Sequence, residues 1–450
     1  MLRRKNEIDF TQGKMTGNIF AYALPIIISG IFQSLYSAAD MFIVGKFIGK
    51  NAFAAIGSTS SLINLVIQLF LGLSVGVTVV ISQYFGAKDD DGMSRASNTA
   101  LAVSIIGGIA LAVIGVLLTE PLLHLMKSPA ETFAMSATYI KIYFSGMPFI
   151  MMYNFSCGIM RAYGDTSKPT QFLIISGFLN VILNIVFVVV LHMDVAGVAF
   201  ATFISQILSA SLALHRLTTA DNACRINIRK LRIDKKELIR IMRYGIPSGI
   251  QSTGYQISGV IIQTAVNSFG PNVMAAKGAI VYIENVMSSI TNGFTSTSTA
   301  ICAQNYGAKN KKRMLKGLYG CLINNVVFLA AFGALSAVFS TSFVEMLTND
   351  AEVAKVGFRI VLSYIIFYFI GGINGVFAGS QRGIGHSFAP MITNLLSISG
   401  FKVLWIFTVF AKYPTLEVLY SSYPVTWVIS SVIQALLFVY FYRKLRFANQ

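Results

Sequence analysis

The chain has 450 residues, of which 55% are hydrophobic and only 12% are charged, and it carries a formal net charge of +17. Because a soluble domain has roughly twice this share of charged residues, the composition excludes an ordinary soluble protein. The basic residues lie in short segments between long apolar runs, so they indicate membrane topology and not a nucleic-acid surface. Unbroken apolar runs of about 20 residues or more predict an all-α polytopic membrane protein, since a β-barrel would alternate over about ten residues.

The apolar runs predict twelve transmembrane helices. Those of the first half are expected at 15–45, 52–84, 94–119, 131–160, 169–191 and 194–219, and those of the second at 236–270, 274–306, 314–343, 352–381, 389–411 and 419–442. The longest polar segment separates the halves. We therefore expect a six-helix bundle over 1–219, a basic linker over 220–243 and a second six-helix bundle over 244–450.

Positive charge gathers on one side of these predicted spans. That side holds Arg3, Arg4, Lys5, Lys14, Lys88, Arg95, Arg161, Lys168, the basic residues of 216–243 (Arg229 and Lys230 among them), Lys309, Lys311, Lys312, Arg313, Lys316, Arg382, Arg443, Lys444 and Arg446. The other side holds only Lys46, Lys50, Lys127, Lys355 and Lys412. Cytoplasmic loops carry the excess of Lys and Arg, so both termini and the linker are expected in the cytoplasm.

An internal repeat relates the two halves. Ser82-Gln-Tyr-Phe-Gly-Ala-Lys88 recurs as Ala303-Gln-Asn-Tyr-Gly-Ala-Lys309, and Arg161-Ala-Tyr-Gly164 recurs as Arg382-Gly-Ile-Gly385, both 221 residues later. Because six spans is an even number, both halves enter the membrane in the same direction. This predicts two bundles related by a pseudo-two-fold axis along the membrane normal, with substrate bound between them.

Asp40 is the first candidate functional residue, because it lies within an apolar run that begins near Met15. A carboxylate in a membrane is costly unless it is protonated, paired or hydrated, although an acid at the membrane edge is the alternative. Asn180 and Asn184 share one helical face, and Thr202 lies on the next predicted span. With Asp40 they form a plausible oxygen-rich cation site, or else ordinary hydrogen bonds between helices.

Glu284 is the other acid well inside an apolar run, and Lys277 lies two turns earlier on the same face. Lys402 is a further cation within a predicted span. These residues indicate either a structural ion pair or an anionic site for cationic substrates. Aromatic residues and methionines that could bind flat cations are abundant. The candidates are Tyr36, Tyr139, Met151, Tyr153, Tyr255, Tyr282, Met287, Tyr364 and Tyr368.

Catalytic motifs are not evident. No P-loop, nucleophile elbow or metal-ligand cluster is present, and the four histidines fall near predicted span ends or loops. We therefore expect no enzyme activity and no cofactor.

At this point the chain resembles the multidrug and toxic compound extrusion (MATE) family. The resemblance is carried by Asp40-Met-Phe-Ile-Val-Gly45, Gln83-Tyr-Phe-Gly-Ala-Lys88 with its copy at 304–309, Arg161-Ala-x-Gly164-Asp-x-x-x-Pro169, and Asn180. It implies a V-shaped pair of six-helix bundles and a secondary antiporter that works by alternating access. The expected substrates are small cationic or amphipathic drugs, exchanged for H⁺ or Na⁺. The alternative is a flippase for a lipid-linked precursor.

The resemblance also implies a cation site at Asp40, Asn180 and Thr202. Position 184 is Asn where many family members have Asp. With one carboxylate in the pocket, H⁺ is the favoured coupling ion and Na⁺ at Asp40 the alternative. We further expect a monomer in the inner membrane of a bacterium, in contact with lipids and not with nucleic acid.

Overall fold

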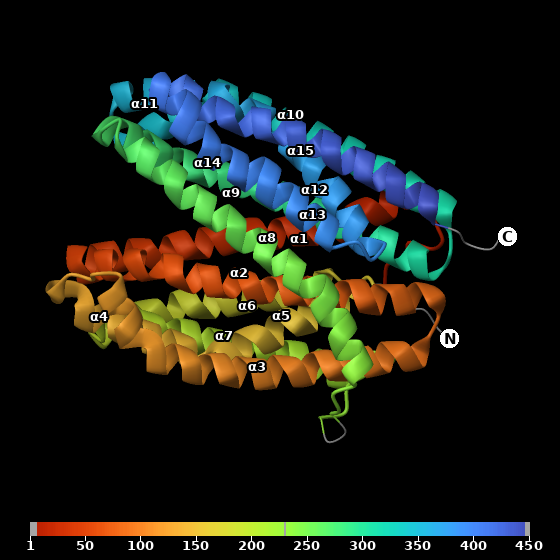
Figure 1. Ribbon diagram of the computed structural model, residues 1–450. Helices are drawn as coiled ribbons and strands as arrows, with labels where there is room; N and C mark the ends of the chain where they lie inside the picture. Colours follow the sequence, from red (N-terminus) through yellow and green to blue (C-terminus); the bar gives the residue numbers. More distant parts are fainter. Residues whose placement is uncertain (1–6, 229–230, 446–450) are drawn as a thin grey trace. The chain divides into compact units, whose positions relative to one another are not determined.

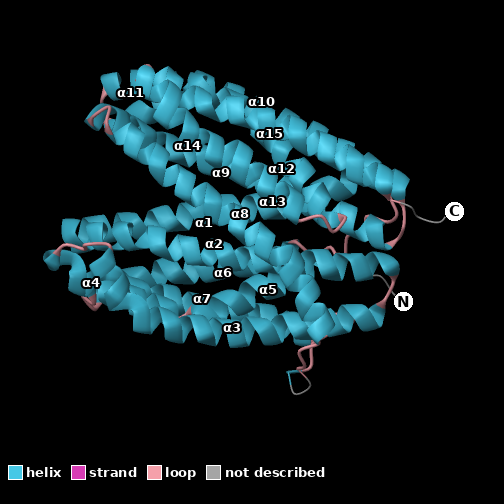
Figure 2. Cartoon of the chain, in the orientation of Figure 1, coloured by secondary structure: helices cyan, strands magenta, loops and turns pink. Residues whose placement is uncertain are grey.

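The computed structural model describes residues 7–228 and 231–445, and every regular element within these ranges is helical (Figures 1 and 2). Predicted cytoplasmic charges at Arg3, Arg4, Lys5, Arg229, Lys230 and Arg446 lie outside the described residues. The first half comprises α1 (Met15–Ile43) with the π-helical turn η1 (Val44–Ile48), α2 (Lys50–Ala87), α3 (Asp90–Leu125), α4 (Ala130–Ser145), α5 (Met147–Ala162), α6 (Ser167–Asn184) with the π-helical η2 (Ile185–Val190), and α7 (Asp194–Thr218).

The second half begins with α8 (Lys235–Asn267), α9 (Pro271–Gly307) and α10 (Lys311–Thr348). It continues with α11 (Ala351–Tyr364), the 3₁₀ turn η4 (Ile365–Phe367), α12 (Tyr368–Gly383), α13 (Phe388–Asn394), the π-helical η5 (Leu395–Gly400), α14 (Phe401–Trp405), the π-helical η6 (Ile406–Phe410) and α15 (Leu416–Lys444).

The helices form two compact units that do not coincide with the sequence halves. The first contains Ile31–Phe85 and Asp89–Gly245, and the second contains Ile8–Gly30, Gly86–Lys88 and the described residues from Ile246 on. The start of α1 therefore packs with the second unit, and the start of α8 packs with the first.

Nine helical segments within 7–228 and 231–445 are long and apolar enough to cross a membrane. The other three predicted spans correspond to the pair α4–α5 and to α8 and α9, which are long helices with more polar residues. The predicted span at 131–160 is broken at Gly146, where α4 ends and α5 begins. Pro148 explains the break, since proline fits the first turn of a helix but not its interior.

The repeated sequence motif folds in the same way in both halves. Lys88 and Lys309 have left-handed backbones, with φ of 57° and 56°. The next residues, Asp89 and Asn310, cap α3 and α10 by accepting from the backbone N–H three residues on. Such caps satisfy N–H groups that lack a partner within the helix.

A close helix crossing is repeated as well, once in each unit. In the first unit a Cβ on Gly158 of α5 would lie 2.9 Å from the backbone oxygen of Ser74 on α2. In the second unit a Cβ on Gly379 of α12 would lie 2.5 Å from the backbone oxygen of Thr295 on α9. Both residues of the second pair lie 221 positions after those of the first, so the structure confirms the repeat.

Candidate functional site

The four residues predicted as a cation site lie together in the first unit. Asn184 Nδ2 donates to Asp40 Oδ1 over 2.5 Å and to Asn180 Oδ1 over 3.2 Å. Asn180 Nδ2 donates to Thr202 Oγ1 over 3.4 Å. These side chains come from α1, α6 and α7, and both asparagines are buried, whereas Asp40 and Thr202 are half-buried.

The Asn180 amide can bind the carboxylate in a second orientation. If its nitrogen and oxygen exchange places, Nδ2 donates to Asp40 Oδ1 over 2.8 Å and the amide oxygen accepts from the Thr202 backbone N–H over 3.3 Å. An amide presents a donor and an acceptor of similar shape, so the protonation state of its neighbour decides which faces the carboxyl group.

One oxygen of this cluster has no hydrogen-bond partner among the described residues, namely Asn184 Oδ1, which is enclosed within the protein. A buried polar atom without a partner costs free energy unless a ligand or water satisfies it. Together with the carboxylate of Asp40 it offers oxygen ligands of the kind that hard cations prefer. This donor set fits either a monovalent cation or a proton.

Irregular backbone follows the polar residues on both helices. The π-helical turn η1 begins four residues after Asp40, and η2 begins directly after Asn184. π-helical turns are rare and occur frequently at functional sites. Sequence analysis missed both turns, because an added residue in a helical turn leaves no clear compositional signal.

Glu284 lies in the second unit and is engaged by two neighbours. Lys277 Nζ is 2.5 Å from Glu284 Oε2, and the hydroxyl of Tyr364 donates to Glu284 Oε1. Lys277 also donates to the Tyr364 hydroxyl over 3.0 Å. Because both carboxylate oxygens already have partners, this geometry favours the alternative of an ion pair within the protein.

The predicted substrate residues fall in several places. Tyr36 is half-buried on α1, Tyr139 lies beside Tyr143 with ring centroids 5.9 Å apart, and Tyr368 meets Trp427 edge-on at 5.0 Å. Tyr153 donates to the Pro169 carbonyl over 2.9 Å, and Gln251 donates to the Tyr255 hydroxyl over 3.2 Å. Met287 is fully buried within the second unit, whereas Tyr282 is 43% exposed.

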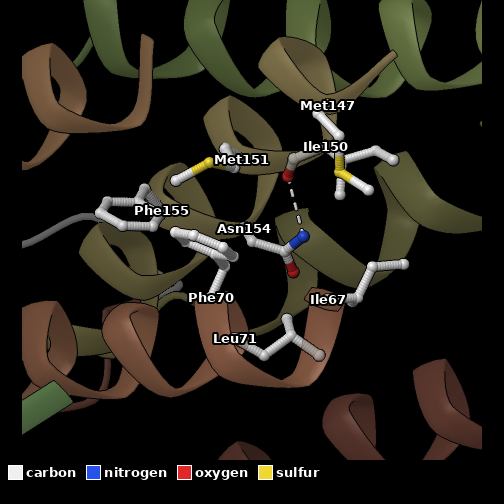
Figure 3. Close-up of a pocket in the computed structure, with 8 residues that line it drawn as sticks. All are labelled: Ile67, Phe70, Leu71, Met147, Ile150, Met151, Asn154 and Phe155. Atoms are coloured by element: carbon white, nitrogen blue, oxygen red, sulfur yellow. Dashed lines mark hydrogen bonds between the residues drawn. The ribbon is translucent and has the colours of Figure 1, made fainter. Parts of the chain in front are cut away.

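Met151 lies in the wall of a small, mainly apolar pocket in the first unit (Figure 3). The pocket is lined from α2 by Ile67, Phe70 and Leu71, and from α5 by Met147, Ile150, Met151, Asn154 and Phe155. Asn154 Nδ2 donates to the Ile150 carbonyl over 2.8 Å, so its amide is partly satisfied within its own helix. The lining suits an apolar group better than a charged one.

Three aromatic residues of α15 were missed by the sequence analysis. Tyr420 and Tyr423 both contact the Tyr364 ring, at centroid distances of 4.9 and 4.7 Å, and Trp427 contacts Tyr423 at 5.6 Å. Their spacing of three and four residues places them on one helix face, and this signal was available in the sequence.

The sequence model of the MatE family matches residues 25–186 and 247–408 of this chain. Among curated proteins, the chain is 26% identical over 418 residues to the Probable multidrug resistance protein YoeA of Bacillus subtilis (strain 168), covering 91% of this chain and 90% of that protein. It is 24% identical over 382 residues to the Multidrug export protein MepA of Staphylococcus aureus (strain NCTC 8325 / PS 47), covering 83% of each.

Solved structures show the same fold. The crystal structure of MATE in complex with MaL6 superposes with a TM-score of 0.91 at 20% identity, covering 98% of this chain and 99% of that chain. The outward-facing conformation of a multidrug resistance MATE family transporter of the MOP superfamily gives the same values. This likeness confirms the predicted all-α fold of two six-helix halves. Because the family model matches each half separately and covers most of the sequence, this chain belongs to the MatE family.

Proposed function

We propose that this protein is a secondary antiporter that exports small cationic or amphipathic compounds in exchange for protons by alternating access. Support comes from its membership of the MatE family and from the names of its relatives, a probable multidrug resistance protein and a multidrug export protein. The apolar helices, long enough to cross a membrane, agree with this role.

The observation that carries the proposal is the contact of the Asp40 carboxylate with the amides of Asn180 and Asn184. Within an apolar helix a carboxylate needs a proton, a cation or a polar partner, and such residues mark ion pathways. Here α6 supplies both amides, so a change at Asp40 acts directly on the hydrogen bonds that join α1 to α6.

Proton binding would switch these hydrogen bonds. When Asp40 is ionised, Asn180 Nδ2 can donate to its Oδ1 atom, and when it is protonated, the carboxyl group can donate to the Asn180 oxygen across the same 2.8 Å. When the Asn180 oxygen faces the protonated carboxyl group, Asn180 Nδ2 can donate to Thr202 Oγ1 on α7. Protonation therefore alters contacts among three helices, which gives the ion a means of favouring one conformation.

The energy available is sufficient for transport. A proton that enters down a membrane potential of 100 mV supplies about 2.3 kcal/mol, and a pH gradient adds about 1.4 kcal/mol for each unit. We favour H⁺ over Na⁺ because the cluster has one carboxylate, and its other oxygen ligands are neutral.

The test is substrate export by purified protein in proteoliposomes, with pH and sodium gradients imposed separately. We expect a pH gradient alone to drive export of a cationic dye, and Asp40→Asn to abolish gradient-driven export while dye binding is kept. Glu131→Gln, a change at an exposed acid of the same unit, serves as the control and should export normally. Full export by Asp40→Asn under a pH gradient would show that the coupling site lies elsewhere.

A further inference from the structure

The second unit contains a cluster of stacked aromatic rings, formed by Tyr364 of α11, Tyr368 of α12 and Tyr420, Tyr423 and Trp427 of α15. Tyr364 and Tyr420 stack in parallel with centroids 4.9 Å apart, and Tyr368 meets Trp427 edge-on at 5.0 Å. The hydroxyl of Tyr420 is buried without a hydrogen-bond partner in the described part of the chain. The cluster thus combines aromatic surface with an unsatisfied polar group.

Lys402 of α14 adjoins this aromatic cluster. Its Nζ atom lies 3.5 Å from the centroid of the Tyr423 ring, and the residue is only 6% exposed. No residue within 7–228 or 231–445 gives Lys402 an ion pair or a side-chain hydrogen bond. A cation–π contact stabilises an ammonium group, but it leaves the three N–H donors of lysine without acceptors.

Lysine outnumbers carboxylate around the aromatic cluster. Glu284 is paired with Lys277 at 2.5 Å, and no carboxylate of the described residues lies within ion-pair distance of Lys402. A protonated Lys402 therefore has no counterion. A buried cation in this situation is stabilised by an added anion, because the attraction between charges is strong where water is scarce.

The repeat gives an independent comparison. Lys402 corresponds to Val181, one residue after Asn180 of the cation cluster. At this level of the repeated helix the first unit presents amides to a carboxylate, and the second presents a lysine to an aromatic cluster. The two units thus place different polar groups at this level of the repeated helix.

We propose that Lys402 and the aromatic cluster form a subsite for one anionic group of an amphipathic substrate, such as a carboxylate, phosphate or sulfonate. The Lys402 ammonium binds the anionic group, and the rings of Tyr423 and Trp427 contact the apolar body. The inference rests on the proposed export function and extends its substrates to zwitterionic and anionic amphiphiles.

The experiment compares rhodamine B, which has a free carboxylate, with its ethyl ester, which lacks that negative charge. Binding of each dye to the full chain in lipid nanodiscs is measured by fluorescence polarisation, with empty nanodiscs subtracted. The readout is the ratio of the two affinities. Because a charge-assisted hydrogen bond is lost, Lys402→Met should lower the preference for the acid about tenfold, whereas Lys402→Arg should keep most of it.

Lys412→Met is the matched control, because Lys412 is an exposed lysine close to Lys402 in sequence, and it should keep the wild-type ratio. An unchanged ratio in a monodisperse Lys402→Met protein would overturn the proposal. A competition on the wild-type chain covers the case in which this variant does not fold. Naphthalene sulfonate should displace rhodamine B more effectively than it displaces the ester, and equal displacement would also count against the subsite.

Failure of the subsite can be told apart from failure of the export function. Gradient-driven export of ethidium by the wild-type chain tests the function alone, since ethidium has no anionic group. Export of ethidium with no Lys402-dependent preference for the acid rejects the subsite and keeps the function. A Lys402-dependent preference for the acid without any gradient-driven export of ethidium rejects the export function and retains the anion-binding subsite.

Discussion

At the scale of single residues, the chemistry of the cation cluster depends on position 184. Asn184 gives one hydrogen to Asp40, and its own Oδ1 atom has no partner among the described residues. The side chain is fully buried, so a change of charge here falls in a site that solvent screens poorly.

Asn184→Asp should therefore move the protein toward sodium dependence. Two carboxylates side by side repel each other, and a bound cation or a shared proton relieves that repulsion. We expect sodium-driven dye export to rise severalfold over that of the wild type in proteoliposomes at constant pH. Asn184→Ser, which removes the amide without adding charge, is the control, and equal sodium dependence of both variants would contradict the prediction.

Glu284 offers a second test at this scale. Glu284→Gln leaves Lys277 without its counterion, and the two side chains are only 21% and 10% exposed. Loss of one partner from such a pair should destabilise the protein by on the order of 2 kcal/mol, measured as a lower thermal unfolding temperature in detergent.

The double variant Lys277→Met/Glu284→Gln removes both charges and should recover most of this stability, because no isolated charge is left. If Glu284→Gln instead keeps full stability and loses export of monovalent cationic dyes, Glu284 binds cationic substrates, which is the other of the two alternatives that the sequence left open.

At the scale of helices, the units depend on close crossings at glycine. Gly379 of α12 touches the backbone of α9, and a Cβ there would lie 2.5 Å from the Thr295 carbonyl oxygen. Small residues let helices approach closely in membranes, where packing replaces the hydrophobic effect between helices.

Gly379→Ala should therefore lower stability by about 1–3 kcal/mol, because the backbone oxygen cannot move aside as a side chain could. Gly278→Ala in α9 is the control, since a Cβ there meets nothing within 4 Å. That control should be neutral or gain up to about 1 kcal/mol from helix propensity. Thermal unfolding of the two variants in the same detergent measures the difference, and equal losses would contradict the role of the crossing.

The helices also show what the sequence could and could not predict. The sequence could group four residues of the first unit, because polar residues stand out within apolar runs and helical spacing related the two asparagines. These residues are Asp40, Asn180, Asn184 and Thr202. The Lys277–Glu284 pair followed from spacing as an alternative reading. The contacts of Lys402 could not be predicted, because α11, α14 and α15 meet only through tertiary packing and helical periodicity does not say which helices are neighbours.

At the scale of the whole molecule, the internal repeat was visible in the sequence because its motif includes turn and helix-capping residues. Such residues act on the backbone only a few positions away, so the same structure requires the same residues in both halves. Lys88 and Lys309 adopt the same left-handed conformation, so the motif specifies the same connection twice. The division into units was not visible in the sequence. Ile8–Gly30 belongs with the second unit because the backbone of Phe10 bonds to Gln304 and Arg313, which lie far along the chain.

The orientation of the chain in the membrane is the last prediction. Lys and Arg are concentrated in the loops on the side of the membrane that holds both termini. Because cytoplasmic loops carry an excess of Lys and Arg, this side should face the cytoplasm. In cells, Ile228→Cys and Lys312→Cys should react with an impermeant maleimide only after the membrane is opened. Ser128→Cys and Asn349→Cys should react in intact cells.

The native cysteines give little background in this measurement. All four are buried, and Cys224, between α7 and α8, has a pKa that burial raises to about 12. The thiolate is the reactive form, so this thiol should stay unreactive near neutral pH in the folded protein. The unmodified chain is the control. Labelling of Ile228→Cys but not Asn349→Cys in intact cells would show that the chain has the opposite orientation in the membrane. Protons would then have to reach the Asp40 cluster from the opposite side of the membrane.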